Sequence, residues 1–324
     1  MCCSSVLNLT SRSNRHVNSC GSWRVAAKML NLESKGLKMK LSCTSVMLPR
    51  WNLDQTFDKL AEYGYDGLEL RCRYIRDDMP EEPSFWGRHI ADISPDNIVD
   101  RAGEIQTASK RSGLKVIALA PQALVGEDDL VDKLIAGALA IDPNAPPMIR
   151  IGAPRHDRTK PYHPQWDDAR SGFEALTQKA GERGVKVLYE IHVGTVAVSC
   201  SRTIELLSGL DPDHIGAIYD VPNMIRVGLE DSKMGMEILG EYLAHCHIGN
   251  ATPVTDKPTR EGDLDQVSWK WNFSDLRDGV ADIPQILQDL KDVGYTGYTS
   301  LEDFGPGDDD EKVNQQGTYL RHHI

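Results

Sequence analysis

The chain has 324 residues, 40% of them hydrophobic and 26% charged, a composition typical of a globular protein with a large core. Its net charge of −12 argues against a nucleic-acid partner, because binding to a phosphate backbone favours a basic surface. No apolar run approaches the roughly 18 residues of a membrane-spanning helix, so we expect no membrane partner. The seven scattered cysteines are interpreted as reduced thiols of a cytoplasmic protein.

The first 38 residues differ in composition from the rest of the chain. They contain six Lys or Arg residues against one acidic residue, Glu33, and they are rich in Ser and Asn. No apolar segment follows a basic one, which excludes a secretory signal of the usual form. An organelle transit peptide is one alternative. We interpret residues 1–38 as a disordered or untranslated extension and residues 39–324 as the folded domain.

From residue 40 onward, apolar runs alternate with helical patterns. Strands are predicted at 40–44, 67–71, 115–120, 148–152, 186–190, 216–220, 243–248 and 297–302. Helices are predicted at 53–63, 96–112, 128–139, 167–183, 202–210, 233–242 and 283–293. Several of these helices end at a glycine, such as Gly64 and Gly113, which suits the left-handed cap that ends a helix.

The repeated strand–helix unit predicts the fold. Strands that are apolar throughout indicate a parallel sheet covered by helices, and eight is the number of strands that closes a TIM barrel. The rival is an open doubly wound sheet, which typically carries a glycine-rich phosphate turn, and the chain has no such motif. We therefore predict a single (β/α)8 TIM barrel. Its long loops, 72–95, 121–127, 153–166 and 249–281, would lie at the carboxyl end, where barrel enzymes place their sites.

Four residues that can bind a metal stand at the ends of four successive predicted strands. They are Glu190 in VLYEIH, Asp220 in AIYDVP, His247 in AHCHIG and Glu302 in TSLEDF. A parallel barrel brings such strand ends together, and three carboxylates with one imidazole suit Mn, Mg, Co or Zn. Unrelated polar residues at strand ends are the alternative. Four in register favour a site for one divalent metal.

Three further residues share the predicted faces of these strand ends. His192 lies two residues after Glu190 and so faces the same side, where it could touch substrate or orient a ligand. Asn223 is either a substrate contact or the cap of an Asx turn beside Pro222. His245 shares the face of His247 one layer deeper and is predicted to be a hydrogen-bonded core histidine.

Three more residues are substrate-binding candidates with plain structural alternatives. Glu69 ends the second strand and either contacts substrate or pairs with Arg71 or Arg73. Arg155 belongs to a basic run, 155–160, that could hold a phosphate or an acidic sugar, or could simply be solvated. Trp271 in the loop 249–281 could stack on a sugar or fasten the loop to the barrel.

Several motifs, in order, carry a resemblance to a known family. They are GYDGLELR, VLYEIHVGT, DVPN, HCHIGN and GYTGYTSLE, and with them the chain from residue 40 to about 304 resembles the xylose isomerase-like TIM-barrel superfamily. That superfamily holds sugar and sugar-phosphate isomerases and epimerases, inosose and dehydroshikimate dehydratases, and AP endonucleases. The resemblance implies that Glu190, Asp220, His247 and Glu302 hold one divalent metal.

The resemblance also implies a reaction on a sugar or sugar phosphate. In the ketose 3-epimerase branch the two metal-bound glutamates move the proton, which makes Glu190 and Glu302 the acid/base pair of an isomerase or epimerase working through a metal-bound enediolate. A lyase of the inosose or dehydroshikimate dehydratase type starts with the same proton abstraction and is the first alternative. A non-catalytic sugar-binding barrel is a further one, and a homo-oligomer is compatible with each.

Departures from the family patterns bear on these alternatives. AP endonucleases bind three metals and need additional histidines, but Asn223 stands where one is expected and no Asp-x-His occurs in 249–281. The second and third strands end with Glu69 and Gln122 rather than histidine. This argues against DNA repair. The arginine that epimerases use after the seventh strand, and their second glutamate after the fifth, have no match here.

Deletion of residues 1–38 is predicted to leave a folded, active protein, because the periodic elements begin at residue 40. Thermal melting of the full and shortened chains checks this. A collapse of the melting temperature on deletion would mean that the extension contributes to the fold.

Overall fold

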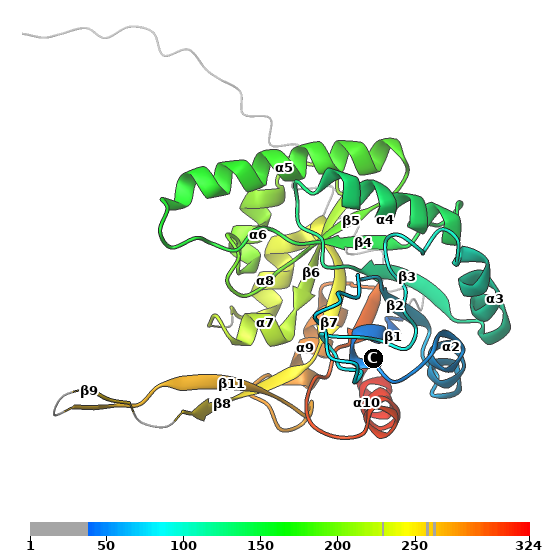
Figure 1. Ribbon diagram of the computed structural model, residues 1–324. Coiled ribbons are helices and arrows are strands. Elements are labelled where there is room, and N and C mark those ends of the chain that lie inside the picture. Colours follow the sequence, from blue (N-terminus) through cyan, green and yellow to red (C-terminus); the bar gives the residue numbers. More distant parts are fainter. Residues whose placement is uncertain (1–37, 229, 257–258, 262–263) are drawn as a thin grey trace, which may run out of the picture. The chain divides into compact units, whose positions relative to one another are not determined.

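The barrel predicted from the sequence is confirmed. The computed structural model describes residues 38–324, apart from 229, 257–258 and 262–263, so all of the predicted extension except Lys38 lies outside the described residues. Eight parallel strands close in the order β1-β12-β7-β6-β5-β4-β3-β2 (Figure 1). Their bounds are β1 Lys40–Thr44, β2 Gly67–Arg71, β3 Lys115–Ala120, β4 Met148–Ile151, β5 Val187–Glu190, β6 Ile215–Asp220, β7 Leu243–Ile248 and β12 Tyr298–Leu301.

Helices surround the strands (Figure 1). The helices are α2 Leu53–Glu62, α3 Ala102–Ser112, α4 Asp128–Ile141, α5 Tyr162–Glu182, α6 Cys200–Leu207, α7 Val221–Ile225, α8 Ser232–Leu239, α9 Ile283–Asp292 and α10 Asp309–His323, with short 3-10 turns at Ser45–Met47 and Gly240–Tyr242. Within the described ranges, no helix is both long enough and apolar enough to cross a bilayer.

Two predicted helix starts are wrong. Helix α3 begins at Ala102 rather than at residue 96, because 96–101 form turns in which Arg101 donates to the backbone carbonyl of Ala91. Helix α5 begins at Tyr162 rather than at residue 167. Pro164 therefore lies inside its first turn, where a missing N–H costs little because that donor has no partner within the helix.

Strand alternation divides the interior into two chemically different layers. Outward-facing side chains such as Leu41 and Tyr189 pack with helix residues such as Phe57 and Phe173 in one apolar core. Several inward-facing positions are polar: Ser42 lies opposite Ser300 in the β1–β12 register, and both are fully buried. The inside of the barrel is therefore where charged side chains can meet.

The loop predicted at 249–281 is instead largely an antiparallel ribbon that projects from the barrel (Figure 1). β8 Asn250–Thr255 pairs with β11 Trp269–Ser274, and β9 Thr259–Glu261 pairs with β10 Leu264–Gln266. The β-branched and aromatic residues of ATPVT and WKWNF favour strands, but the pairing joins only this segment to itself. The periodicity of the barrel therefore gave no sign of it.

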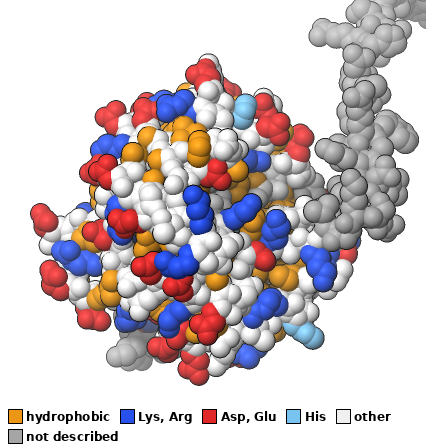
Figure 2. Space-filling view, turned by 90° about the vertical axis from the view of Figure 1, so that its right-hand side faces the viewer, with side chains coloured by type: hydrophobic (Ala, Val, Ile, Leu, Met, Phe, Trp, Pro, Cys, Tyr) orange, Lys and Arg blue, Asp and Glu red, His pale blue; other side chains and the backbone are white. Residues whose placement is uncertain are grey.

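Charge on the surface is mixed. Figure 2 shows acidic and basic side chains interspersed over one face, with hydrophobic ones scattered among them. Exposed ion pairs include Arg111 with Asp54 and Asp58. Such pairs contribute about 0–1 kcal/mol each, so apolar burial must supply most of the stability.

Asn250 joins the base of the ribbon to the segment before α9, and its loss is predicted to be costly. Its side chain is buried and bonds four backbone groups, donating to Leu276 O and Ala281 O and accepting from Ala251 N and Ala281 N. Asn250→Ala leaves these groups buried without partners and should cost about 3 kcal/mol in free energy of unfolding, measured in urea. The control Asn272→Ala, on the exposed part of the ribbon, should change it by less than about 0.5 kcal/mol. Equal changes in the free energy of unfolding for the two variants would contradict this role of Asn250.

Candidate metal centre

The barrel register brings the four predicted metal ligands to one place. Glu190 and Asp220 are the last residues of β5 and β6, His247 is in β7, and Glu302 directly follows β12. Asp220 lies opposite His247 in the β6–β7 register, and the Glu302 N–H donates to Ile248 O at 2.9 Å. Neighbouring strands therefore present adjacent ligands, as the sequence spacing requires.

The imidazole of His247 lies at the centre of the group. Its Nδ1 is 3.1 Å from a carboxylate oxygen of Asp220, 3.2 Å from one of Glu302 and 3.4 Å from one of Glu190. One donor atom from each residue lies within 4.8 Å of all the others, and all four residues are buried. Three hard oxygen donors and one nitrogen donor are thus positioned to bind a divalent metal.

The surroundings of Asp220 and His247 raise the pKa values of both groups. Burial, together with the charges of Glu302 and Glu190, raises the pKa of Asp220 to about 7 against the opposing bond from His247. Burial alone would lower the pKa of His247, but the carboxylates around it raise that pKa above its usual range. So many carboxylates in a low-dielectric interior require a compensating positive charge, which a divalent ion supplies.

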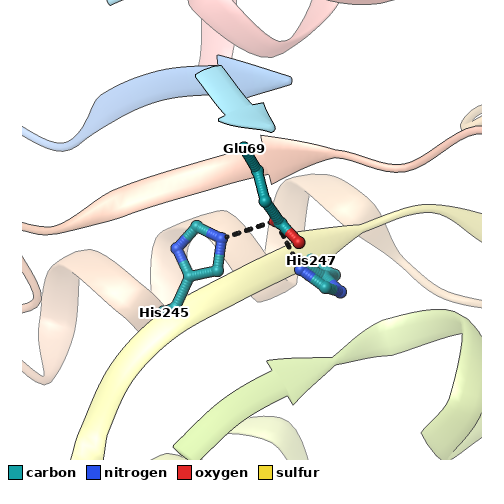
Figure 3. A group of neighbouring side chains, drawn as sticks. All are labelled: Glu69, His245 and His247. Carbon is teal, nitrogen blue, oxygen red and sulfur yellow. Dashed lines mark hydrogen bonds and ion pairs between the residues drawn. The ribbon is translucent and has the colours of Figure 1, made fainter. Parts of the chain in front are cut away.

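Glu69 fixes the orientation of His247 from the other side of the ring (Figure 3). Its Oε2 accepts hydrogen bonds from His247 Nε2 at 2.8 Å and from His245 Nε2 at 3.1 Å. With Nε2 donating, the Nδ1 lone pair of a neutral His247 is directed at the carboxylates. The bond to Glu69 therefore sets the tautomer in which the ring can coordinate a metal.

His245 is a hydrogen-bonded core histidine, as its position predicts. It is fully buried, and burial lowers its pKa despite the bond to Glu69, so it is neutral at pH 7. Glu69, His245 and His247 are close enough to hold an ion themselves. However, the one oxygen that the two rings share accepts an N–H from each, which accounts for the contacts without a cation.

Gly249 allows the close approach of β7 and the residue after β12. A Cβ atom at this position would lie 2.3 Å from the backbone oxygen of Glu302 and 2.6 Å from the ring of Pro222. Any larger residue would push Glu302 away from His247. The glycine in HCHIGN therefore has a geometric role that the sequence pattern alone does not indicate.

A cavity of about 580 Å³ opens at the metal-ligand group and is lined by Glu190 and Glu302. Of the residues predicted to bind substrate, His192, Asn223 and Arg155 also line it. Asn223 has a capping role as well, because its backbone N–H donates to Asp220 Oδ1 at 2.8 Å while its side chain accepts from Val193 N. These three residues remain our proposed substrate contacts.

Two predicted substrate contacts lie elsewhere. Glu69 does not line the cavity; it lies inside the barrel and bonds two histidines, rather than the Arg71 or Arg73 that its strand position suggested. Trp271 lies opposite Pro253 in the ribbon and packs against the core, which matches the alternative that it fastens the loop. The aromatic side chains that do line the cavity are Trp86, Phe273 and Phe304. Phe304 contacts both of the others, with ring centroids 4.6 and 5.3 Å away.

Two buried arginines of the cavity were missed at the sequence level. Arg150 Nη1 donates to both carboxylate oxygens of Glu190 at 2.9 and 3.0 Å, and its Nη2 donates to Pro121 O at 2.7 Å. This pair holds the pKa of Glu190 below its usual range although burial acts in the other direction. Arg73 lines the same cavity. The sequence signal that could have identified Arg150 was a charged residue at an inward-facing position of an apolar strand, in PMIRIG.

The chain is an eight-stranded parallel α/β barrel with carboxylates and a histidine positioned at its carboxyl end to bind a metal. The chain belongs to the xylose isomerase-like TIM barrel family, whose sequence profile matches residues 57–322.

Curated relatives of this chain include inosose dehydratases. One from Clostridium perfringens strain 13 is 26% identical over 266 residues, which cover 77% of this chain and 81% of the relative. One from Bacillus licheniformis is 28% identical over 152 residues, which cover 45% of this chain and 49% of the relative. With several such relatives the matching segment spans about half of their length.

Solved structures share the fold at low sequence identity. A probable 3-DHS dehydratase from Bacillus anthracis has a TM-score of 0.65 and 15% identity, with 87% of this chain and 99% of that chain covered. A 3-keto-D-glucoside 4-epimerase from E. coli has a TM-score of 0.63 and 15% identity, with coverage of 88% and 100%. A xylose isomerase-like TIM barrel protein from Mycobacterium smegmatis in complex with magnesium has a TM-score of 0.60 and 14% identity, with coverage of 88% and 96%. These likenesses show the fold alone.

Removing the charge of Glu69 is predicted to weaken metal binding without unfolding the chain. Glu69→Gln keeps the size of the side chain but loses the anion that holds His247, so affinity for Mn²⁺ should fall by about 10- to 100-fold in a calorimetric titration. His247→Ala should weaken it further.

The matched control for this prediction is Asp289→Asn. It removes another buried carboxylate, one that bonds Ser232 and Gln285 far from the cavity, and it should leave the Mn²⁺ affinity unchanged. Unchanged affinity in Glu69→Gln would contradict the orienting role. Two Mn²⁺ ions per chain in the unaltered protein would mean that Glu69, His245 and His247 form a site of their own.

Proposed function

We propose that this chain is a divalent-metal-dependent lyase that removes water from a polyhydroxylated ketone. The observation that carries the proposal is an asymmetry between the two glutamates that line the cavity. Glu190 is bound through both of its oxygens by Arg150, whereas among the described residues the side chain of Glu302 forms its only ion pair with the imidazole of His247. One carboxylate is therefore committed to an ion pair, and one is available as a base.

We infer that Glu190, Asp220, His247 and Glu302 hold one ion, with Mg²⁺, Mn²⁺, Co²⁺ and Zn²⁺ as the candidates. Such an ion, when bound, polarises a carbonyl oxygen and makes the neighbouring C–H more acidic. The donor set supports this assignment, because three carboxylates favour a hard divalent ion and the imidazole is tolerated by all four.

Glu302 is the proposed general base. Its carboxylate takes the proton from the carbon beside the carbonyl, and Arg150 keeps Glu190 ionised and in place as a ligand. The electron pair of the C–H bond forms a C=C bond while the C–O bond of the hydroxyl on the next carbon breaks. That oxygen leaves as water with a proton from a cavity side chain.

His192 is the proposed proton donor. Its ring lies in the cavity wall, and Nδ1 bonds the carbonyl oxygen of Val193 at 2.9 Å. Because a carbonyl only accepts, Nδ1 carries a proton, and in the imidazolium form of the ring Nε2 carries the second proton, which it gives to the leaving oxygen. Glu302 later returns its proton to solvent or to His192, which restores the starting state.

Isomerisation or epimerisation of a sugar or sugar phosphate is the second candidate function. It is favoured by the presence of both Glu190 and Glu302 in the wall of one cavity, because a two-base mechanism removes a proton on one face and returns it on the other. The Arg150–Glu190 pair counts against it, since Glu190 could act as a base only by giving up the ion pair in which Arg150 Nη1 bonds both of its oxygens. The curated inosose dehydratases also support the lyase over the epimerase.

Glu302→Gln is predicted to lower turnover by about 10²- to 10⁴-fold, because the amide cannot accept the substrate proton. Purified protein should contain about one divalent ion per chain by elemental analysis, and the variant is assayed with saturating metal so that loss of the ion is not the cause. Products from an inosose and ketose panel are identified by mass spectrometry in D₂O.

The product separates the two candidate functions. A product lighter by one water supports the lyase, and a product of the parent composition with one deuterium on carbon supports the epimerase. The control Asp289→Asn should keep full turnover. Full activity in Glu302→Gln would refute its role as the base, and the absence of bound metal after addition of Mn²⁺ or Co²⁺ would refute the metal-dependent mechanism.

A further inference from the structure

Four arginines line the cavity of a chain whose net charge is −12: Arg73, Arg150, Arg155 and Arg226. Arg73 is buried and the side chain of Arg150 is only 13% exposed, while Arg155 and Arg226 are exposed. The carboxylates that line the same cavity are Glu127, Glu190 and Glu302. Positive charge is therefore arranged from the rim inward, in a protein that is acidic as a whole.

Arg73 has little to compensate its charge. It is 4% exposed, its Nε donates to Ala120 O at 3.2 Å, and its guanidinium lies 5.9 Å from the ring centroid of Trp86. Among the residues that the structure describes, no carboxylate forms an ion pair with it. A guanidinium has five N–H donors, so the two terminal nitrogens of Arg73 have donor capacity left for a ligand in the cavity that the residue lines.

The neighbours of Arg73 add to this imbalance. Burial, and then the positive charges of Arg150 and Arg71, lower the pKa of Arg73 to about 9. Arg150 is already paired with Glu190, and Arg71 donates to Gly87 O at 2.8 Å. Arg73 is thus the cation in the cavity wall that gains most from an added anion.

The charge balance of the barrel interior points the same way. With His247 neutral, as a metal ligand is, four buried carboxylates and three guanidinium groups give a net charge of −1, which a divalent ion changes to +1. The groups are Glu69, Glu190, Asp220 and Glu302 against Arg71, Arg73 and Arg150. A site loaded with metal therefore favours one further negative charge near Arg73.

We propose that the substrate of this site carries a permanent anionic group, a carboxylate or a phosphate, and that Arg73 binds it. The planar guanidinium fork suits either group through two parallel hydrogen bonds. Arg155 and Arg226 at the rim attract the anion as it enters. The inference rests on the proposed function, because the anionic group belongs to the ketone that is dehydrated. An anionic substrate would distinguish this site from one that binds a neutral inosose.

Binding of three probes to the full chain loaded with Mg²⁺ tests the proposal. D-Glucose, D-gluconate and D-glucose 6-phosphate are respectively neutral, carboxylated and phosphorylated, and their affinities are compared by calorimetry. One or both anionic probes should bind at least about tenfold more tightly than glucose, since charge-assisted hydrogen bonds contribute that much. Preference for gluconate alone identifies a carboxylate, and preference for glucose 6-phosphate alone identifies a phosphate.

Three variants assign this preference to Arg73. Arg73→Gln should abolish it, and Arg73→Lys should keep part of it, because the charge remains without the fork. Arg76→Gln is the matched control, since Arg76 lies exposed in the same loop, paired with Asp78, and should leave the preference unchanged. Equal affinity for all three probes, or a preference that survives Arg73→Gln at unchanged Mg²⁺ content, would overturn the proposal.

The readout separates this inference from the proposed function. Probe binding needs no turnover, and Glu302→Gln should keep the anion preference while it loses activity. An anion preference without dehydration of any ketone would count against the lyase alone. Dehydration of a neutral ketone with no anion preference would count against Arg73 alone.

Discussion

Negative charge buried inside the barrel is the constraint on which the site depends. Glu69, Glu190, Asp220 and Glu302 all lie in the interior, where an uncompensated carboxylate is very costly. Glu69 accepts hydrogen bonds from histidine N–H groups, and Glu190 pairs with Arg150. Asp220 and Glu302 lie beside Nδ1 of His247. The proposed divalent ion, bound between these groups, would offset the remaining repulsion.

The closed barrel holds these charged side chains in fixed positions close to one another. Hydrogen bonding on both sides of every strand fixes the height of each strand end, so Asp220 lies opposite His247 and Glu302 follows the strand beside it. Close packing at Gly249 brings the backbone of Glu302 within reach of His247. Ligands held by a rigid sheet need little reorganisation when a metal or substrate binds.

Arg150 and Arg73 have different proposed roles in the cavity. In the proposed mechanism, Arg150 removes Glu190 from acid/base chemistry by pairing with it, and Glu302 is the base. Arg73 has no such partner among the described residues and adds a positive charge to the wall. Together they favour an elimination from a charged substrate over a symmetric two-base exchange on a neutral one, within a fold that serves both reactions.

Periodicity in the sequence determined the barrel and identified the four residues proposed as metal ligands. Apolar runs separated by amphipathic segments are local signals, and Glu190, Asp220, His247 and Glu302 each stand at the end of such a run. The helix starts at Ala102 and Tyr162, and the ribbon at 250–274, were not predicted, because turn bonds, a proline in the first turn and a self-paired strand override the local pattern.

Only the tertiary structure decided which side chains support the ligands. Glu69 meets His247 across 178 residues of chain, and Arg150 meets Glu190 across 40, so no local spacing relates them. The same holds for Trp271, which the sequence placed in the site and the fold packs against the core, and for Arg73, which the fold places in the cavity wall. Inward or outward direction follows from strand alternation, but the choice of partner inside a barrel depends on side-chain reach across its interior. The sequence of a single strand does not contain that information.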